Sequence, residues 1–183
     1  MPEHSWTLDS GYRLEVFAEQ DRISETDVID LWASEGVVPA EEAQRRVSEV
    51  LLVATDPEGT PAGVSTAYLE YNEQLRARLW YGREFVAAAH RKAGVMMGLA
   101  YAGRDYLQAR FASGADRRAI GLLFEVENEV LKRGGPGPIA RYGPKARWPT
   151  DYIFIGENAK GDHIRVHYFP GAHAPEPAQL GST

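Results

Sequence analysis

The residues best suited to chemistry lie at positions 84–96, where an apolar run gives way to a basic turn. The stretch reads "EFVAAAHRKAGVM", with Arg91, Lys92 and Gly94 in the turn. If a strand ends near Val86 and a helix begins near Gly94, the first N–H groups of that helix lack intrahelical acceptors and carry the positive end of its dipole. Such a turn can bind an anion, or it can be a solvated turn whose glycine supplies a positive φ. The spacing alone leaves both interpretations open.

A histidine pattern near the C-terminus offers little for metal chemistry. His163, Arg165 and His167 alternate along "HIRVHYF" and share one face of a predicted strand. The two histidines lie roughly 13 Å apart by backbone rise, too far for one metal ion. The sequence has no cysteine, which excludes a thiolate metal site, a disulfide framework and a cysteine nucleophile. We therefore expect no metal, and we interpret these side chains as surface or cleft residues.

The composition is that of a globular protein with an acidic surface. The 183 residues are 44% hydrophobic and 25% charged, with a formal net charge of -6. This charge argues against nucleic acid and anionic membranes as partners. The sequence shows neither a secretory signal nor an apolar stretch of the roughly 18 to 20 residues that cross a bilayer, so we expect a cytoplasmic protein. Several basic residues nevertheless gather at or just before the turn and suit a small anionic ligand: Arg76, Arg78, Arg83, Arg91 and Lys92.

The surrounding elements predict a mixed sheet, and hence an α/β or α+β fold. Strands are expected within residues 11–18, 51–71, 76–88 and 117–128 and in a hairpin within 151–169 that turns at 158–162. Helices are expected within 24–36, with Ser24 as N-cap, within 39–50 and from 94 to about 111. The strand–helix–strand unit at 79–128 demands a parallel, right-handed crossover inside an otherwise antiparallel sheet. Residues 132–150 are predicted to be irregular.

The stretch "FVAAAHRKAGVMMGLA" resembles the acetyl-CoA-binding segment of the GNAT superfamily of N-acyltransferases. In that family a strand-ending Val is followed five residues later by an Arg or Gln that opens R/Q-x-x-G-x-G/A. Here Val86 is followed by Arg91, and Gly94 and Met96 hold the later positions. The order of elements over residues 12–169 is similar as well. The resemblance implies a GNAT-like, mostly antiparallel sheet with one central parallel β-α-β crossover and flanking helices.

The resemblance also implies a function and a domain. Residues 1–170 would form an acyltransferase domain followed by a flexible tail, 171–183, and the family often forms homodimers. Acetyl-CoA would be the cosubstrate, and a neutral amine of a small molecule or protein would attack its thioester directly. The acidic net charge would favour cationic amines. The implied cosubstrate-binding residues are Val86, Arg91, Lys92, Ala93, Gly94, Val95, Met96 and Asn128.

Two carboxylates and two tyrosines compete for the proton-transfer roles. Glu84 shares a strand face with Val86 and is the preferred general base, with Glu70 as a second candidate; either can instead be a solvated edge carboxylate. Tyr142 is preferred over Tyr152 as the general acid, because it precedes "GP" where the family's Tyr precedes "GF".

Two departures from the family pattern keep other functions open. Met96 stands where the family usually has Gly or Ala, and the usual spacing from Asn128 to a Tyr is lost. A non-catalytic acyl-CoA-binding or sensing module on the same fold is therefore the main alternative. A small β-rich interaction domain without CoA is a third possibility, which leaves the basic turn unexplained.

Overall fold

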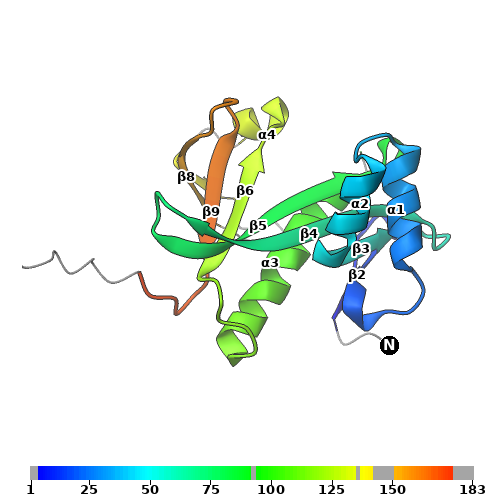
Figure 1. Ribbon diagram of the computed structural model, residues 1–183, viewed down its shortest axis with the longest axis horizontal. Coiled ribbons are helices and arrows are strands. Elements are labelled where there is room, and N and C mark those ends of the chain that lie inside the picture. The colour runs from blue at the N-terminus through cyan, green and yellow to red at the C-terminus, as the bar shows by residue number, and fades with distance from the viewer. Residues whose placement is uncertain (1–3, 92–93, 135–136, 142–150, 175–183) are drawn as a thin grey trace, which may run out of the picture.

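The computed structural model describes residues 4–91, 94–134, 137–141 and 151–174 (Figure 1). Within these ranges one sheet of nine strands has the order β1-β2-β3-β4-β5-β6-β9-β8-β7. Its strands are β1 (Ser5–Thr7), β2 (Arg13–Val16), β3 (Val50–Thr55), β4 (Pro61–Asn72), β5 (Ala77–Val86), β6 (Gly121–Val126), β7 (Ile139–Arg141), β8 (Asp151–Glu157) and β9 (His163–Tyr168). Neighbouring strands are antiparallel except β5 and β6, which run parallel. The predicted mixed sheet with one parallel crossover is confirmed.

Helices cover both faces of the sheet. They are α1 (Glu25–Ser34), α2 (Ala40–Arg46), α3 (Val95–Ser113) and α4 (Glu129–Gly134), with 3₁₀ turns at Phe17–Glu19, Val47–Glu49 and Ala88–His90. Figure 1 shows α1 and α2 on one face of the sheet and α3, which connects β5 to β6, on the other. The helix predicted from residue 94 is therefore confirmed within one or two residues of its predicted ends.

Two apolar clusters hold α1, α2 and α3 against the sheet. Trp32 of α1 and Ala43 of α2 pack on Val53 and Val64 on one face. On the other face α3 packs its apolar side against the first strands and the end of β5, through a cluster that contains Leu14, Leu52, Val86, Val95, Leu99 and Ala102. Since Phe85 belongs with the first cluster and Val86 with the second, odd-numbered residues at the end of β5 face α1 and α2, and even-numbered ones face α3.

Three short elements differ from the sequence prediction. Strands β1 and β7, of three residues each, were not predicted, because a strand that short carries no measurable alternation and forms by pairing with β2 or β8. Helix α4 covers part of the region predicted to be irregular, and Asn128 begins it by accepting from the Val130 N–H at 2.8 Å. The hairpin turn at 158–162 is confirmed by hydrogen bonds between Asn158 and Asp162.

The chain ends against the core as far as the structure describes it. Phe169 is buried beside Leu107 and Phe111, and Ala172 packs on the same cluster. Residues 175–183 lie outside the described ranges, so the division into a domain and a flexible tail stays a prediction.

The start of α1 offers a test of the local fold. Ser24 caps the helix with a reciprocal pair of hydrogen bonds, since its hydroxyl accepts from the Asp27 N–H and the Asp27 carboxylate accepts from the Ser24 N–H. We expect Ser24→Ala to lower the free energy of unfolding by about 1 kcal/mol and the Tm by roughly 2–4 °C in a domain of this size, measured by urea and thermal denaturation. Ser34→Ala is the matched control, because the Ser34 hydroxyl makes only an exposed bond to the Leu31 carbonyl. Equal losses in the two variants would contradict the capping role.

Candidate functional site: the gap between strands β5 and β6

Strands β5 and β6 diverge within the sheet and leave a gap between them. Their last parallel pair is Gly82 with Phe124. Beyond it, β5 continues to Val86 and pairs only with β4, whereas β6 continues to Val126 and pairs only with β9. The two strand ends are the arrowheads of β5 and β6 that point apart in Figure 1.

Backbone groups of β5 point into this gap. The Ala87 N–H donates to the Ala62 carbonyl at 3.0 Å, so this is a hydrogen-bonded pair of the β4–β5 ladder. Because hydrogen-bonded and non-hydrogen-bonded pairs alternate along an antiparallel ladder, the N–H and C=O groups of Glu84 and Val86 turn away from β4. They face the gap, along an edge that β6 no longer covers.

The paired part of β5 supports this direction. The Arg78 carbonyl, on another even-numbered residue, accepts from the Ile120 N–H at 3.1 Å on the β6 side. At the far end, the Val86 carbonyl accepts from the Arg91 Nε at 3.2 Å. Arg91 thus ties the end of the strand to the turn that follows it.

Close packing marks the point at which the strands part. The Phe124 ring lies over Gly82, where a Cβ atom would come within 2.3 Å of the ring. The same ring meets Tyr152 of β8 edge-on, with 5.5 Å between ring centroids. Gly82 is therefore required by the approach of Phe124, which forms the floor of the gap.

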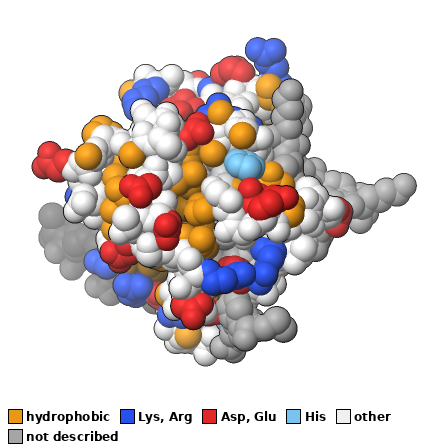
Figure 2. All heavy atoms as spheres, turned by 90° about the vertical axis from the view of Figure 1, so that its right-hand side faces the viewer, with side chains coloured by type: hydrophobic (Ala, Val, Ile, Leu, Met, Phe, Trp, Pro, Cys, Tyr) orange, Lys and Arg blue, Asp and Glu red, His pale blue; other side chains and the backbone are white. Residues whose placement is uncertain are grey.

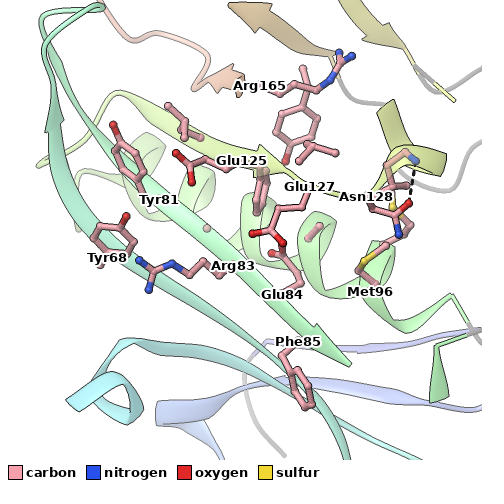
Figure 3. Close-up of a pocket in the computed structure, with 18 of the residues that line it drawn as sticks. Tyr68, Tyr81, Arg83, Glu84, Phe85, Met96, Glu125, Glu127, Asn128 and Arg165 are labelled. Carbon is pink, nitrogen blue, oxygen red and sulfur yellow. Dashed lines mark hydrogen bonds between the residues drawn. The ribbon is translucent and has the colours of Figure 1, made fainter. Parts of the chain in front are cut away.

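A cavity of about 470 Å³ occupies the gap and reaches both faces of the sheet. We call the part lined by Trp32, Arg46, Tyr68, Arg83 and Phe85 the α1/α2 half, and the part lined by Met96, Met97, Ala100, Tyr101, Phe124 and Tyr152 the α3 half. Figure 3 shows Tyr68, Tyr81 and Arg83 on one side of the cavity and Met96 and Asn128 on the other. On the side of the molecule that carries α1, hydrophobic side chains gather in a strip with charged side chains on both sides (Figure 2).

Glu84 lies in the wall of this cavity. Its side chain is half-buried, and one carboxylate oxygen accepts from the Ser65 hydroxyl at 3.4 Å. Burial raises the pKa of Glu84 to about 8, because the surrounding protein disfavours the charged form more than the Ser65 hydroxyl favours it. The carboxyl can therefore exchange a proton near neutral pH while still reachable from the cavity.

The start of α3 is compatible with both interpretations left open by the sequence. Gly94 is the N-cap residue, with φ 76° and ψ 5°, a left-handed conformation that other residues rarely adopt. No side chain caps the helix among the described residues, so the N–H groups that follow Gly94 remain available to an anion. Val95 is buried in the core and Arg91 is exposed at the turn. The positive φ of Gly94 is what the turn requires, and anion binding at the N–H groups that follow it stays a prediction.

Met96 and Asn128 stand beside one another at the mouth of the cavity. Figure 3 shows the Met96 side chain directed from the first turn of α3 toward Asn128, and both residues line the cavity. The Asn128 side-chain carbonyl accepts from the N–H groups of Val130 and Leu131, so it holds the start of α4. Its amide NH₂ is the part left to contact a ligand.

The other predicted residues divide between exposed positions and undescribed ones. Glu70 is exposed on β4 and does not line the cavity. Lys92, Ala93 and Tyr142 lie outside the described residues, so their roles stay predictions. Tyr152 does line the cavity, but protein encloses its hydroxyl and the ring serves as wall.

Sequence reasoning missed the residues of the α1/α2 half. Trp32, Arg46, Tyr68 and Arg83 come from four different elements. No spacing along the chain connects them, and each alone has the signature of a core aromatic or a solvated arginine. Only the clustering of arginines near the turn, which includes Arg83, pointed in this direction.

Two further observations concern other kinds of chemistry. Over the described part of the chain, no group of three His, Asp or Glu side chains is placed to hold a metal ion. Within the same ranges, no helix has both the length and the apolar character needed to cross a membrane. His163 and His167 contact Phe154 and Tyr152, with centroid distances of 4.9 and 5.7 Å, and the His167 ring bonds to Gln108 of α3.

Comparison with known proteins identifies the fold. No family model matches the chain, and no curated protein matches it in sequence. Among solved structures, the GNAT family N-acetyltransferase YhbS from Escherichia coli, in complex with CoA, superposes with a TM-score of 0.53 at 16% identity, over 90% of this chain and 83% of that one. A mutant of the toxin AtaT, bound to the C-terminus of the antitoxin AtaR, superposes with a TM-score of 0.52 at 9% identity, over 86% of this chain and 93% of that one. The chain has the GNAT fold, as the resemblance around Val86 and Arg91 predicted.

The raised pKa of Glu84 predicts a pH dependence of stability. In the unfolded chain the carboxyl ionises near its ordinary pKa of 4.5, but in the folded protein it keeps its proton up to about pH 8. Between these values the folded state binds more protons, so the free energy of unfolding falls as the pH rises. We expect the free energy of unfolding of Glu84→Gln to equal that of wild type near pH 4.5 and to exceed it increasingly as the pH rises toward about 8. Urea denaturation at each pH measures this difference.

Glu70→Gln serves as the control for this measurement. Glu70 is an exposed glutamate on the adjacent strand, so Glu70→Gln should show the same dependence of the free energy of unfolding on pH as wild type. Parallel profiles for wild type and Glu84→Gln would show that the Glu84 carboxyl is not buried as described.

Proposed function

We propose that the protein is an acetyl-CoA-dependent N-acetyltransferase, most plainly supported by one observation. One cavity in the gap between two parallel strands is lined both by Met96, in the uncapped first turn of α3, and by Glu84, the candidate base. The GNAT fold makes an acyl-CoA the natural occupant. We also propose that residues 1–170 form the catalytic domain.

The residues around the gap fit an extended donor with an anionic end. The N–H groups of Gly94, Val95 and Met96, with Arg91 beside them, would bind the pyrophosphate, and the same role is proposed for Lys92 and Ala93. The exposed backbone edge of Glu84 and Val86 would pair with the amide groups of the pantetheine arm, as one strand pairs with another. The Asn128 amide lies at the mouth of the same cavity and would contact the arm there.

Bound in this way, acetyl-CoA would supply a thioester carbonyl as the electrophile. The acceptor amine would enter through the α1/α2 half of the cavity, form a bond from its nitrogen to the acetyl carbon, and displace the thiolate as the carbon–sulfur bond breaks. Glu84 would take the proton that the ammonium form of the amine must lose, directly or through a water. Its pKa of about 8 is well matched to this role near neutral pH.

The leaving thiolate needs a proton in return. Tyr142 is the proposed donor on the strength of its place in the sequence, and Tyr142→Phe should lower turnover if the assignment holds. Tyr152 is the other candidate acid, but protein encloses its hydroxyl, which makes it a poorer proton donor.

A non-catalytic acyl-CoA-binding module is the second candidate function. Met96 favours it, because a long side chain at the start of α3 narrows the space beside Asn128. Such a module would bind the same ligand without releasing a thiol, so the two functions separate in one experiment.

The first test measures binding and then thiol release. Acetyl-CoA at 100 times its dissociation constant should add about 2.7 kcal/mol to the free energy of unfolding, seen as a rise in Tm. Thiol release in the presence of a panel of primary amines should then identify turnover. A thermal shift without thiol release from any amine would support the binding module, and no shift at all would reject both functions.

The second test concerns Glu84. We expect Glu84→Gln to keep the thermal shift with acetyl-CoA and to lower kcat by about 10²- to 10⁴-fold, the usual range for a general base. For wild type, kcat/KM should rise with pH and level off above about 8, because the deprotonated carboxyl is the active form. Glu70→Gln should behave as wild type, and full activity in Glu84→Gln would remove Glu84 from the mechanism.

A further inference from the structure

Two arginines line the α1/α2 half of the cavity. Arg46 ends α2 and Arg83 lies on β5, and both side chains contribute to the wall. Arg83 lies over the Tyr68 ring at 4.3 Å, and Arg46 lies over the Trp32 ring at 5.6 Å. Each guanidinium thus packs against an aromatic ring of the cavity wall.

Each of these arginines has one carboxylate beside it. Arg83 stands 3.5 Å from Glu49, and Arg46 stands 3.6 Å from Glu42, whose side chain is 43% exposed. The Glu49 oxygen nearest Arg83 is buried and makes no hydrogen bond among the described residues. Burial, and next to it the positive charge of Arg83, lowers the pKa of Arg46. The two positive charges therefore act on one another across the same wall.

Two buried donors at this wall lack acceptors. Within the described part of the chain, neither the Trp32 indole N–H nor the Arg46 Nε–H has a hydrogen-bond partner. Trp32 is only 1% exposed. Buried donors are almost always paired in folded proteins, and each unpaired one costs roughly 1–3 kcal/mol. The two donors belong to neighbouring side chains, because Arg46 lies over the Trp32 ring.

We infer that Arg46, Arg83 and Trp32 form a subsite for a carboxylate carried by the acceptor amine. A carboxylate has only acceptor atoms, and it would meet here two guanidinium groups and an indole N–H, all of them donors. The Arg46 side chain would turn on its flexible stem to expose both unpaired donors to the incoming group. The acceptor is thus a small amino acid-like molecule. That the ligand carries an amine rests on the proposed function. That it carries a carboxylate rests on the side chains of the α1/α2 half of the cavity.

Charges of both signs line the cavity. The net charge of -6 favoured cationic acceptors, and Glu84, Glu125 and Glu127 belong to the lining, yet Arg46 and Arg83 place two guanidinium groups in its α1/α2 half. Contacts within a few ångströms outweigh the screened field of distant surface charges. The size of the cavity adds a limit, since about 470 Å³ has to hold the end of the donor as well as the acceptor.

The test compares amines that differ only in the carboxylate. The panel holds straight-chain amino acids with one to five carbons between amine and carboxylate, each beside its carboxamide and its plain alkylamine. Thiol release from acetyl-CoA should be at least tenfold more efficient, in kcat/KM, for one or more of the amino acids than for their two partners. Equal or better turnover of the uncharged partners throughout the series would overturn the subsite.

Paired arginine variants locate the effect. Arg46→Gln should raise KM for the preferred amino acid by roughly 10- to 100-fold, as expected for loss of a hydrogen bond to a charged group, and should reduce the preference for that amino acid over its alkylamine partner. Arg45→Gln is the matched control, because Arg45 is the preceding residue of α2 and its side chain is 69% exposed. The same KM in Arg46→Gln and Arg45→Gln would overturn the assignment.

A binding measurement separates this inference from the proposed function. The chain has four tryptophans, so the indole N–H signal of Trp32 can be assigned in a ¹⁵N-labelled NMR spectrum by comparison with Trp32→Phe. The amino acids should shift that signal and their carboxamides should not. A shift without any thiol release would uphold the subsite and reject the acetyltransferase. No shift with any amino acid would overturn the subsite even if other amines are acetylated.

Discussion

The structure depends on the separation of two parallel strands that remain paired for only three residues. From Trp80 to the Gly82–Phe124 pair, β5 has a partner strand on both sides. From there to its end at Val86, the backbone of β5 pairs only with β4. A sheet edge in the middle of a protein is costly unless something occupies it, because N–H and C=O groups there lose water without gaining a partner. The Phe124 ring packs over Gly82 at the last paired position, and the Arg91 side chain donates to the last carbonyl of β5.

The burial that raises the pKa of Glu84 also lowers the stability of the folded protein. The same protein atoms that raise the pKa of the carboxyl to about 8 make its ionised form unfavourable in the folded state. Ser65, which lies opposite Glu84 on β4, offsets part of this with one long hydrogen bond. The carboxyl therefore costs the folded protein stability at any pH at which it would otherwise ionise.

The two halves of the cavity differ in how they are built. In the α3 half, side chains of α3, Phe124 of β6 and Tyr152 of β8 lie next to one continuous segment, which runs from the end of β5 through the turn into α3. In the α1/α2 half, the wall is assembled from α1, α2, β4 and β5. Under the proposed function, the donor would bind mainly backbone groups that most sequences with this turn could supply, and the acceptor would bind particular side chains.

This difference explains what could be predicted. The sequence by itself determined the segment from Glu84 to Met96 and the strand–helix–strand crossover around it, because turn chemistry, capping and hydrophobic period are local properties that survive without the rest of the protein. It also singled out Glu84, by its position on the same strand face as Val86. Only the tertiary structure decided that burial raises the pKa of the Glu84 carboxyl and that the Asn128 side-chain carbonyl accepts hydrogen bonds at the start of α4. It also decided that Arg46, Trp32 and Arg83 line the same cavity. Those facts depend on packing between segments far apart in the chain, which leaves no periodic trace in the sequence.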